Sequence, residues 1–159
     1  MQIFIIGVGK IKEKYLQEGI AEYTKRLRPY VRITIIEIPE EKRAENLSPS
    51  QHGLAKDGEG ARILAAIPHD TQTIALDPNG ERWSSGNLAD HIHEREISGR
   101  NNLCFMIGGD LGLSDLVLTR SNIRLSLSPM TFTHQMARLI LLEQLYRASK
   151  INHREPYHK

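Results

Sequence analysis

Two kinds of apolar pattern alternate along this chain. Continuous apolar runs, as at 3–8 and 103–107, are typical of strands buried on both faces of a parallel sheet. Between such runs, apolar residues recur at the spacing of amphipathic helices, as they do over 16–27. The predicted strands are 3–8, 31–38, 73–76, 103–107 and 123–127, and the predicted helices are 16–27, 48–67, 88–97, 114–120 and 133–149. Strand and helix therefore alternate five times, which predicts an α/β fold with a mainly parallel five-stranded sheet and helices on both faces, in one domain over 1–159.

Local signals refine two of these elements. Ser48, followed by Pro49 and then by Gln51, has the pattern of a capping box and predicts where the second helix begins. The sequence Asp-Pro-Asn-Gly at 77–80 predicts a turn that ends the third strand.

The last predicted helix is apolar around nearly its whole circumference. Its apolar residues are Met136, Leu139, Ile140, Leu141, Leu142, Leu145 and Tyr146. A helix of this kind must be covered on more than one side, and in a chain this small a sheet covers only one. A second copy is the simplest cover for the other side, so we expect a homodimer through this helix.

Composition narrows the class of protein. With 159 residues, 40% hydrophobic and 25% charged, the chain has the make-up of a soluble globular domain. No apolar run reaches membrane-spanning length, and no secretory signal is present, so we expect a cytoplasmic protein without membrane contact. The single cysteine, Cys104, lies inside an apolar run and is expected to be a small buried hydrophobe, not a reactive thiol.

The net charge is only +2, but basic residues gather in two groups. One comprises Lys25, Arg26, Arg28 and Arg32; the other comprises Arg120, Arg124, Arg138, Arg147, Lys150, Arg154 and Lys159. Basic groups on a near-neutral protein suggest an acidic partner such as RNA, and an ordinary solvated surface is the alternative.

Candidate chemistry lies at three strand ends, since ligands of α/β sheets bind outside the carboxyl ends of the strands. These ends are at 76–78, at the glycine turn 107–109 and at 127–133. They meet only if the third, fourth and fifth strands are neighbours, which residue spacing does not show.

Other ligand motifs are incomplete. Gly7-Val8-Gly9 begins a dinucleotide fingerprint, but position 12, where a third glycine is needed, is Lys12. His91 and His93 are two residues apart on a predicted helix and so point in different directions, which argues against a metal pair. No metal site is expected.

The C-terminal tail carries an aromatic residue, two imidazoles and several charges in the sequence NHREPYHK at 152–159. Disorder is the default for such a tail. Its composition nevertheless suits RNA, because aromatic rings stack on unpaired bases and cations hold phosphates.

At these residues the chain resembles the RlmH family, the large-subunit ribosomal RNA pseudouridine N3-methyltransferases of the SPOUT class. The segments that carry the resemblance are FMIGGDLGL at 105–113, LSLSPMT at 125–131, HQMAR at 134–138, EQLYRA at 143–148 and PYHK at 156–159. Further matching segments, IIGVGK at 5–10, EYTKRL at 22–27 and IEIP at 36–39, extend it over essentially the whole chain.

The resemblance implies a fold whose C-terminal part is threaded into a trefoil knot, which general topology rules alone would exclude. It also implies that the knot loops hold S-adenosyl-L-methionine. Carried over by position, the cofactor-binding residues are Leu76, Gly108, Leu127, Ser128, Pro129, Met130, Thr131 and Phe132.

The resemblance further implies a homodimer in which the tail of one chain reaches the cofactor of the other. The residues expected at the reaction centre are Arg147, Tyr157, His158, Lys159 and His134. His158 is the candidate for assisting deprotonation, Tyr157 for stacking on or orienting the base, and Arg147 and Lys159 for holding phosphates. Family members often have arginine at the position of Lys159, and lysine keeps the charge but lacks the bidentate fork.

The implied function is methylation of N3 of a pseudouridine in 23S ribosomal RNA of the assembled ribosome. Two alternatives come from other classes of protein. A non-catalytic ribosomal RNA-binding protein accounts for the basic groups and the tail but leaves the strand-end residues without a role. A nicotinamide-dependent dehydrogenase shares the α/β pattern but lacks the third glycine and a substrate domain.

Overall fold

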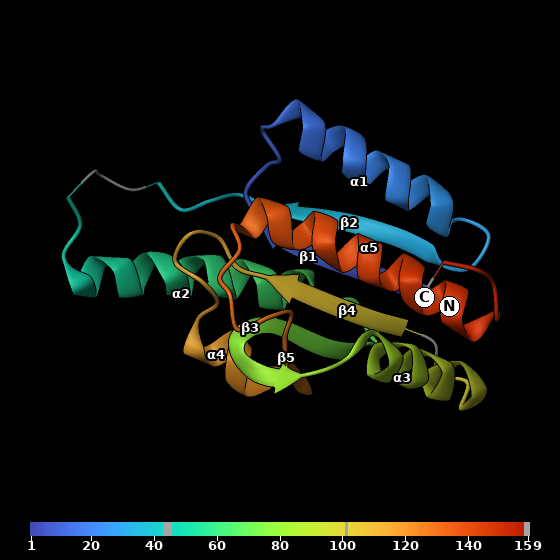
Figure 1. Cartoon of the computed structure of the whole chain (residues 1–159). Coiled ribbons are helices and arrows are strands. Elements are labelled where there is room, and N and C mark those ends of the chain that lie inside the picture. The colour runs from blue at the N-terminus through green and yellow to red at the C-terminus, as the bar shows by residue number, and fades with distance from the viewer. Residues whose placement is uncertain (43–45, 101, 158–159) are drawn as a thin grey trace.

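Strands and helices alternate along the whole chain in the computed structural model, which describes residues 1–42, 46–100 and 102–157 (Figure 1). The strands are β1 (Gln2–Val8), β2 (Arg32–Ile38), β3 (Gln72–Arg82), β4 (Asn102–Ile107) and β5 (Ile123–Ser126). The helices are α1 (Lys14–Leu27), α2 (Pro49–Ala66), α3 (Ser85–Ile97), α4 (Asp115–Arg120) and α5 (His134–Asn152). All strand pairs are parallel and the order is β2-β1-β4-β3-β5, so the predicted α/β sheet is confirmed.

Side chains alternate across the central strands and divide the core into two layers. Ile5 belongs to the layer that α1, α3 and α5 cover, and Leu141 of α5 packs into the same cluster. Ile6 belongs to the opposite layer, where Ile63 of α2 and Val117 of α4 pack. Helices therefore lie on both faces, as the alternation of apolar runs and helical patterns predicted.

Two predictions about single residues are confirmed. The Ser48 side chain accepts a hydrogen bond from the Gln51 backbone, and the Gln51 side chain accepts one from the Ser48 backbone, which completes the capping box. Cys104 is fully buried in β4, and burial raises the pKa of its thiol to about 12. Such a thiol is protonated and enclosed, so it serves the core.

The predicted turn at 77–80 is wrong, because β3 continues through it to Arg82. Leu76 and Glu81 are both register partners of Leu125 on β5, so the four residues between them form a bulge inside the strand. The Asp77 carboxylate holds the bulge, since it accepts hydrogen bonds from the Asn79 backbone and from the Arg124 guanidinium. A turn-forming sequence here makes a bulge because both flanking segments pair with the same neighbouring strand.

The reasoning that α5 needs a second chain to cover it also requires correction. α5 lies on the sheet between α1 and α3 and packs against both of them (Figure 1). Leu141, Leu142 and Leu145 are fully buried within this one chain. Neighbouring helices thus provide the lateral cover that we expected from a partner, and the homodimer stays a prediction.

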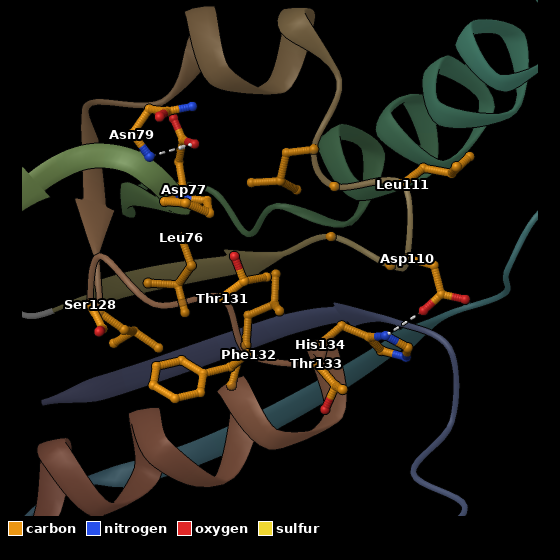
Figure 2. Close-up of a pocket in the computed structure, with 18 of the residues that line it drawn as sticks. Leu76, Asp77, Asn79, Asp110, Leu111, Ser128, Thr131, Phe132, Thr133 and His134 are labelled. Carbon is orange, nitrogen blue, oxygen red and sulfur yellow. Dashed lines mark hydrogen bonds and ion pairs between the residues drawn. The ribbon is translucent and has the colours of Figure 1, made fainter. Parts of the chain in front are cut away.

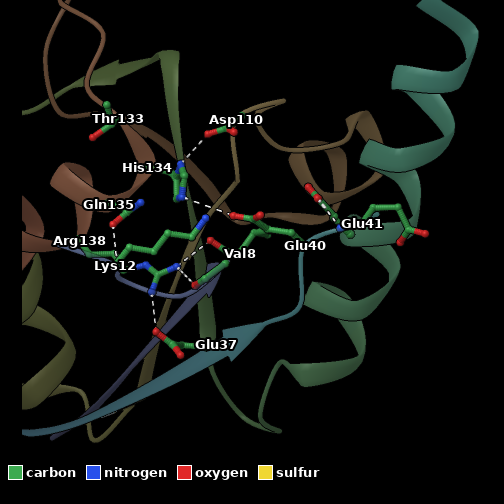
Figure 3. A network of polar contacts seen from close by, with 12 residues as sticks. Val8, Lys12, Glu37, Glu40, Glu41, Asp110, Thr133, His134, Gln135 and Arg138 are labelled. Atoms are coloured by element: carbon green, nitrogen blue, oxygen red, sulfur yellow. Dashed lines mark hydrogen bonds and ion pairs between the residues drawn. The ribbon is translucent and has the colours of Figure 1, made fainter. Parts of the chain in front are cut away.

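The largest fully buried side chain is a charged one, Arg138 on the first half of α5 (Figure 3). Its Nη2 donates to the carbonyls of Val8 at 2.7 Å and Gly9 at 2.6 Å, and its Nη1 donates to Glu37 Oε1 at 3.1 Å. Burial lowers the pKa of the guanidinium, and the nearby Glu37 carboxylate raises it. The sequence analysis placed Arg138 and Arg124 in a basic group that suggested an acidic partner. In the structure, each of them forms an ion pair with a carboxylate of its own chain.

Replacing Arg138 by Met should destabilise the fold by about 3–5 kcal/mol, because two buried carbonyls and the Glu37 carboxylate lose their partner. Urea denaturation followed by circular dichroism measures the loss. Arg26→Met is the matched control, since Arg26 pairs with Glu22 at the solvent-exposed surface of α1 and should matter much less. Equal losses in the two variants would contradict the structural role of Arg138.

Candidate active site

The three strand ends singled out in the sequence lie together, because β4, β3 and β5 are neighbours in the sheet. A pocket of about 660 Å³ opens at their carboxyl ends (Figure 2). Of the eight predicted cofactor residues, seven line it: Leu76, Gly108, Leu127, Ser128, Met130, Thr131 and Phe132. Pro129 is not among the lining residues, although both of its chain neighbours are.

The glycine turn after β4 forms one wall. A Cβ atom on Gly108 would lie 2.4 Å from the backbone carbon of Gly112, so only glycine permits this approach. The turn closes through a hydrogen bond of 3.0 Å from the Gly112 N–H to the Gly109 carbonyl. Gly112 has a φ of +77°, in the left-handed region that favours glycine. Backbone is thereby brought to the pocket surface with little side chain in front of it.

The loop from β5 to α5 forms the facing wall. The Ser128 Oγ accepts a hydrogen bond of 3.0 Å from the Met130 N–H, which shapes the loop, and Thr133 caps α5 by accepting from the Met136 N–H at 3.2 Å. Met130 is 73% exposed and Phe132 38% exposed. Large apolar side chains exposed beside a pocket are available to cover a flat, apolar ligand.

Acidic groups that the sequence analysis missed also surround the pocket. Asp77 lines it and is 8% exposed, with Arg124 Nε and Nη2 at 2.9 Å and 2.5 Å from its Oδ2. Asp110 follows the glycine turn and lies 3.0 Å from Nδ1 of His134. Asp77 lies in the strand end 76–78 that the sequence analysis marked, but we assigned no site role to it or to Asp110, because both residues are typical of turns.

His134 lies at the pocket, as a predicted reaction-centre residue should, and joins three segments of the chain (Figure 3). It is the first residue of α5, its Nδ1 faces Asp110 after β4, and its Nε2 is 3.9 Å from Glu40 after β2. Its Nε2 is buried and has no hydrogen-bond partner among the described residues.

Arg147 and Tyr157, by contrast, are not at this pocket. Thirteen residues separate His134 from Arg147 on α5, which corresponds to about 20 Å along a helix. The Tyr157 hydroxyl donates a hydrogen bond to Glu143 Oε1 at 3.1 Å and lies 3.2 Å from the Tyr23 hydroxyl. The Arg147 guanidinium lies 4.8 Å from the centre of the Tyr157 ring. The predicted residues His158 and Lys159 lie outside the described residues.

Burial, with hydrogen bonds to Tyr23 and Glu143, raises the pKa of Tyr157, so its hydroxyl is protonated at neutral pH. The hydrogen bond that the Arg147 guanidinium donates to the Glu143 carboxylate raises the pKa of Arg147, which keeps its charge. The tail therefore places the protonated hydroxyl of Tyr157 against Tyr23 of α1 and Glu143 of α5, beside the cation of Arg147 on α5. The default expectation of a disordered tail does not apply as far as Tyr157.

The other candidate motifs do not form sites. The guanidinium of Arg138 fills the space beside Gly7, where a Cβ would lie 2.4 Å from its Nε, so this glycine makes room for a side chain of the protein itself. His91 is hydrogen-bonded to Gln72 at 2.8 Å, and His93 is exposed. Over the described ranges, no three His, Cys, Asp or Glu residues are grouped to hold a metal ion, and no helix is long and apolar enough to cross a bilayer.

Comparison with known proteins agrees with the α/β fold. A family model described as "Predicted SPOUT methyltransferase" matches residues 1–158, and the chain belongs to this family. Membership implies a trefoil knot and dependence on S-adenosylmethionine. Proteins named ribosomal RNA large subunit methyltransferase H in Clostridioides difficile and Bacillus pumilus are each 54% identical to this chain over 159 residues, 100% of both chains. A Methanoregula boonei protein, whose name gives the same assignment provisionally, is 60% identical over the same full length.

Gly108→Ala should destabilise the protein by about 1–3 kcal/mol or more, because the new methyl group meets backbone 2.4 Å away that cannot move aside without opening the turn. Gly53→Ala on α2 is the matched control. Nothing lies within 4 Å of a Cβ at position 53, so alanine there should be neutral or stabilise by about 0.5–1 kcal/mol. Thermal unfolding of both variants tests the pair, and a well-tolerated Gly108→Ala would show that the turn is looser than described.

Proposed function

We propose that this protein transfers a methyl group from S-adenosylmethionine to ribosomal RNA of the large subunit. The observation that carries the proposal is the pocket at the adjacent ends of β3, β4 and β5, which gathers seven of the eight residues expected to bind the cofactor. Membership of the SPOUT methyltransferases and the names of the full-length relatives support the reaction and the RNA substrate.

The chemistry of the lining fits this cofactor. Leu76, Leu127 and Phe132 offer apolar surface to an adenine ring, and the backbone of the glycine turn offers hydrogen-bonding groups that discriminate its edge. The carboxylate of Asp110 stands at the same pocket, where negative charge suits the sulfonium and ammonium groups of the ligand, whereas the carboxylate of Asp77 is paired with Arg124. A volume of about 660 Å³ is within the range of pockets that enclose a ligand of this size.

S-adenosylmethionine, when bound, supplies an activated methyl group. The protein's residues must then align the acceptor nitrogen and manage its proton. Tyr157 is protonated in the described position, so we assign it to orienting or stacking on the base and not to removing the proton. His158 remains our candidate for assisting deprotonation at N3 of a pseudouridine, and Arg147 and Lys159 remain candidates for holding phosphates.

The separation of the two groups supports a site shared between two chains. Arg147 lies on the second half of α5 and Tyr157 packs against that half, far along the helix from the pocket at its first residue. If they act on the cofactor, the cofactor must be that of a second copy. We therefore infer a homodimer in which each pocket is completed by the partner's tail, and an assembled ribosomal particle as the substrate, since one small chain offers little RNA-binding surface.

Isothermal titration should detect binding of S-adenosylmethionine and none of NADH. Phe132→Ala should weaken the binding about tenfold, because the variant loses an aromatic wall of the pocket. Tyr15→Ala, which removes an exposed aromatic ring from α1, should leave the affinity unchanged. Binding of NADH in place of S-adenosylmethionine would favour the dehydrogenase alternative, and RNA binding without any cofactor binding would favour the non-catalytic one.

Deleting residues 157–159 should abolish transfer of labelled methyl groups to large ribosomal subunits and leave cofactor binding measurable. Mixing this truncated chain with the full-length chain carrying Leu76→Arg, which blocks the pocket, should then restore activity. If chains exchange at random, about a quarter of the wild-type sites are intact in the mixture. Full activity of the truncated protein alone would refute the role of the tail, and a mixture without activity would refute the shared site.

A further inference from the structure

A second cavity, of about 730 Å³, lies at the amino ends of the strands, at the end of the sheet opposite the pocket. Its lining includes the first residues of three adjacent strands, Gln2 of β1, Arg32 of β2 and Asn102 of β4. The lining also includes Thr24 of α1, Arg28 directly after the end of α1, and Tyr30 in the connection to β2. We call this cavity the basic hollow.

The charge of the basic hollow is one-sided. Among the residues that the structure describes, no acidic residue lines it, and two arginines do, Arg28 and Arg32. Neither guanidinium group forms an ion pair with any carboxylate in the part of the chain that the structure describes, and both residues are exposed. Five other arginines are paired with carboxylates, namely Arg26, Arg62, Arg124, Arg138 and Arg147. Arg28 and Arg32 differ from the remaining arginines in that they share one cavity. Two unpaired guanidinium groups in one cavity favour an anion, and their planar fork matches the oxygens of a phosphate.

The basic hollow is continuous with the C-terminal tail through Tyr30. The Tyr30 ring stands 4.8 Å from that of His153, and the Tyr30 hydroxyl donates to Glu155, 2.7 Å away. That carboxylate is itself held by Lys150, so it does not leave an unbalanced negative charge beside the cavity. Figure 1 shows the start of β1 and the end of α5 at the same end of the molecule.

We infer that the basic hollow binds a backbone phosphate of the RNA substrate, with Arg28 and Arg32 as its ligands. The choice of RNA as the source of the phosphate rests on the proposed function. In a shared site, the tail that serves the partner's pocket would lie next to this hollow, so a strand of RNA could span both. Arg28 also caps α1, where a cation offsets the helix dipole, and this structural role is the alternative that the experiment must separate.

Binding of a fluorescein-labelled single-stranded RNA, followed by anisotropy over a series of salt concentrations without cofactor, tests the inference. Each lost phosphate contact should reduce the slope of log K against log salt by about 0.7. The double variant Arg28→Gln/Arg32→Gln should therefore bind RNA more weakly, with the slope reduced by about 1.4. S-adenosylmethionine binding should not change, because the cavity is remote from the pocket.

Lys14→Gln/Arg120→Gln is the matched control, since it removes the same net charge from exposed positions outside the basic hollow and should leave the slope near that of the wild type. Arg28→Lys/Arg32→Lys keeps both charges and should retain most of the slope, which also guards against a double variant that is merely unstable. An unchanged slope in the glutamine variant, or an equal loss in the control, would overturn the inference while leaving the methyltransferase proposal intact.

Two further outcomes separate the sources of phosphate and the two proposals. Inorganic phosphate should displace the RNA no better than chloride at equal ionic strength. Stronger displacement would reassign the basic hollow to free phosphate and overturn its assignment to RNA. Absence of binding of this single-stranded RNA by the wild-type protein would overturn the inference, whereas the proposed function, whose substrate is an assembled ribosomal particle, is tested separately by methyl transfer to large ribosomal subunits.

Discussion

The buried guanidinium of Arg138 is the constraint on which the arrangement of the site depends. It ties the first half of α5 to the carboxyl ends of β1 and β2 through Val8, Gly9 and Glu37. A charge that is 1% exposed is stable only while these partners remain in place. Because α5 begins at His134, four residues earlier, the same contacts set where the helix enters the pocket wall. Position 7 accommodates only glycine, since a larger side chain would collide with the guanidinium of Arg138.

The pocket itself results from strand order. Three segments separated by tens of residues become one cavity because β3 lies between β4 and β5. Each segment then contributes a different local device: a bulge held by Asp77 and Arg124, a glycine turn at Gly108, and a loop that leaves Met130 and Phe132 exposed. These devices present backbone and apolar surface, and they suit the cofactor on which SPOUT methyltransferases depend.

The residues to which we assign a function are distributed along the length of α5. The cofactor pocket we propose lies at its first turn, and the tyrosine and arginine cluster lies on its second half. The helix is too rigid for one chain to bring these groups together, so distance supports the shared site where apolar coverage does not. The reasoning that led to the dimer from the circumference of α5 fails because α1 and α3 already flank it. The basic hollow, which we assign to an RNA phosphate, lies at the end of the sheet opposite the pocket.

Much of the fold was readable from the chain alone, because periodicity and caps are local. The apolar runs identified all five strands, Ser48 marked the start of α2, and the strand-end segments contained most of the pocket. The resemblance to a family supplied the cofactor, and no local pattern did. Tertiary structure alone decided which strands are neighbours, that Arg138 is internal, that 77–80 bulges instead of turning, and that Tyr157 docks on Tyr23. The physical reason is that the spacing of apolar residues indicates only whether a position is buried. The residue it contacts can lie more than a hundred positions away in the chain, as Val8 does for Arg138.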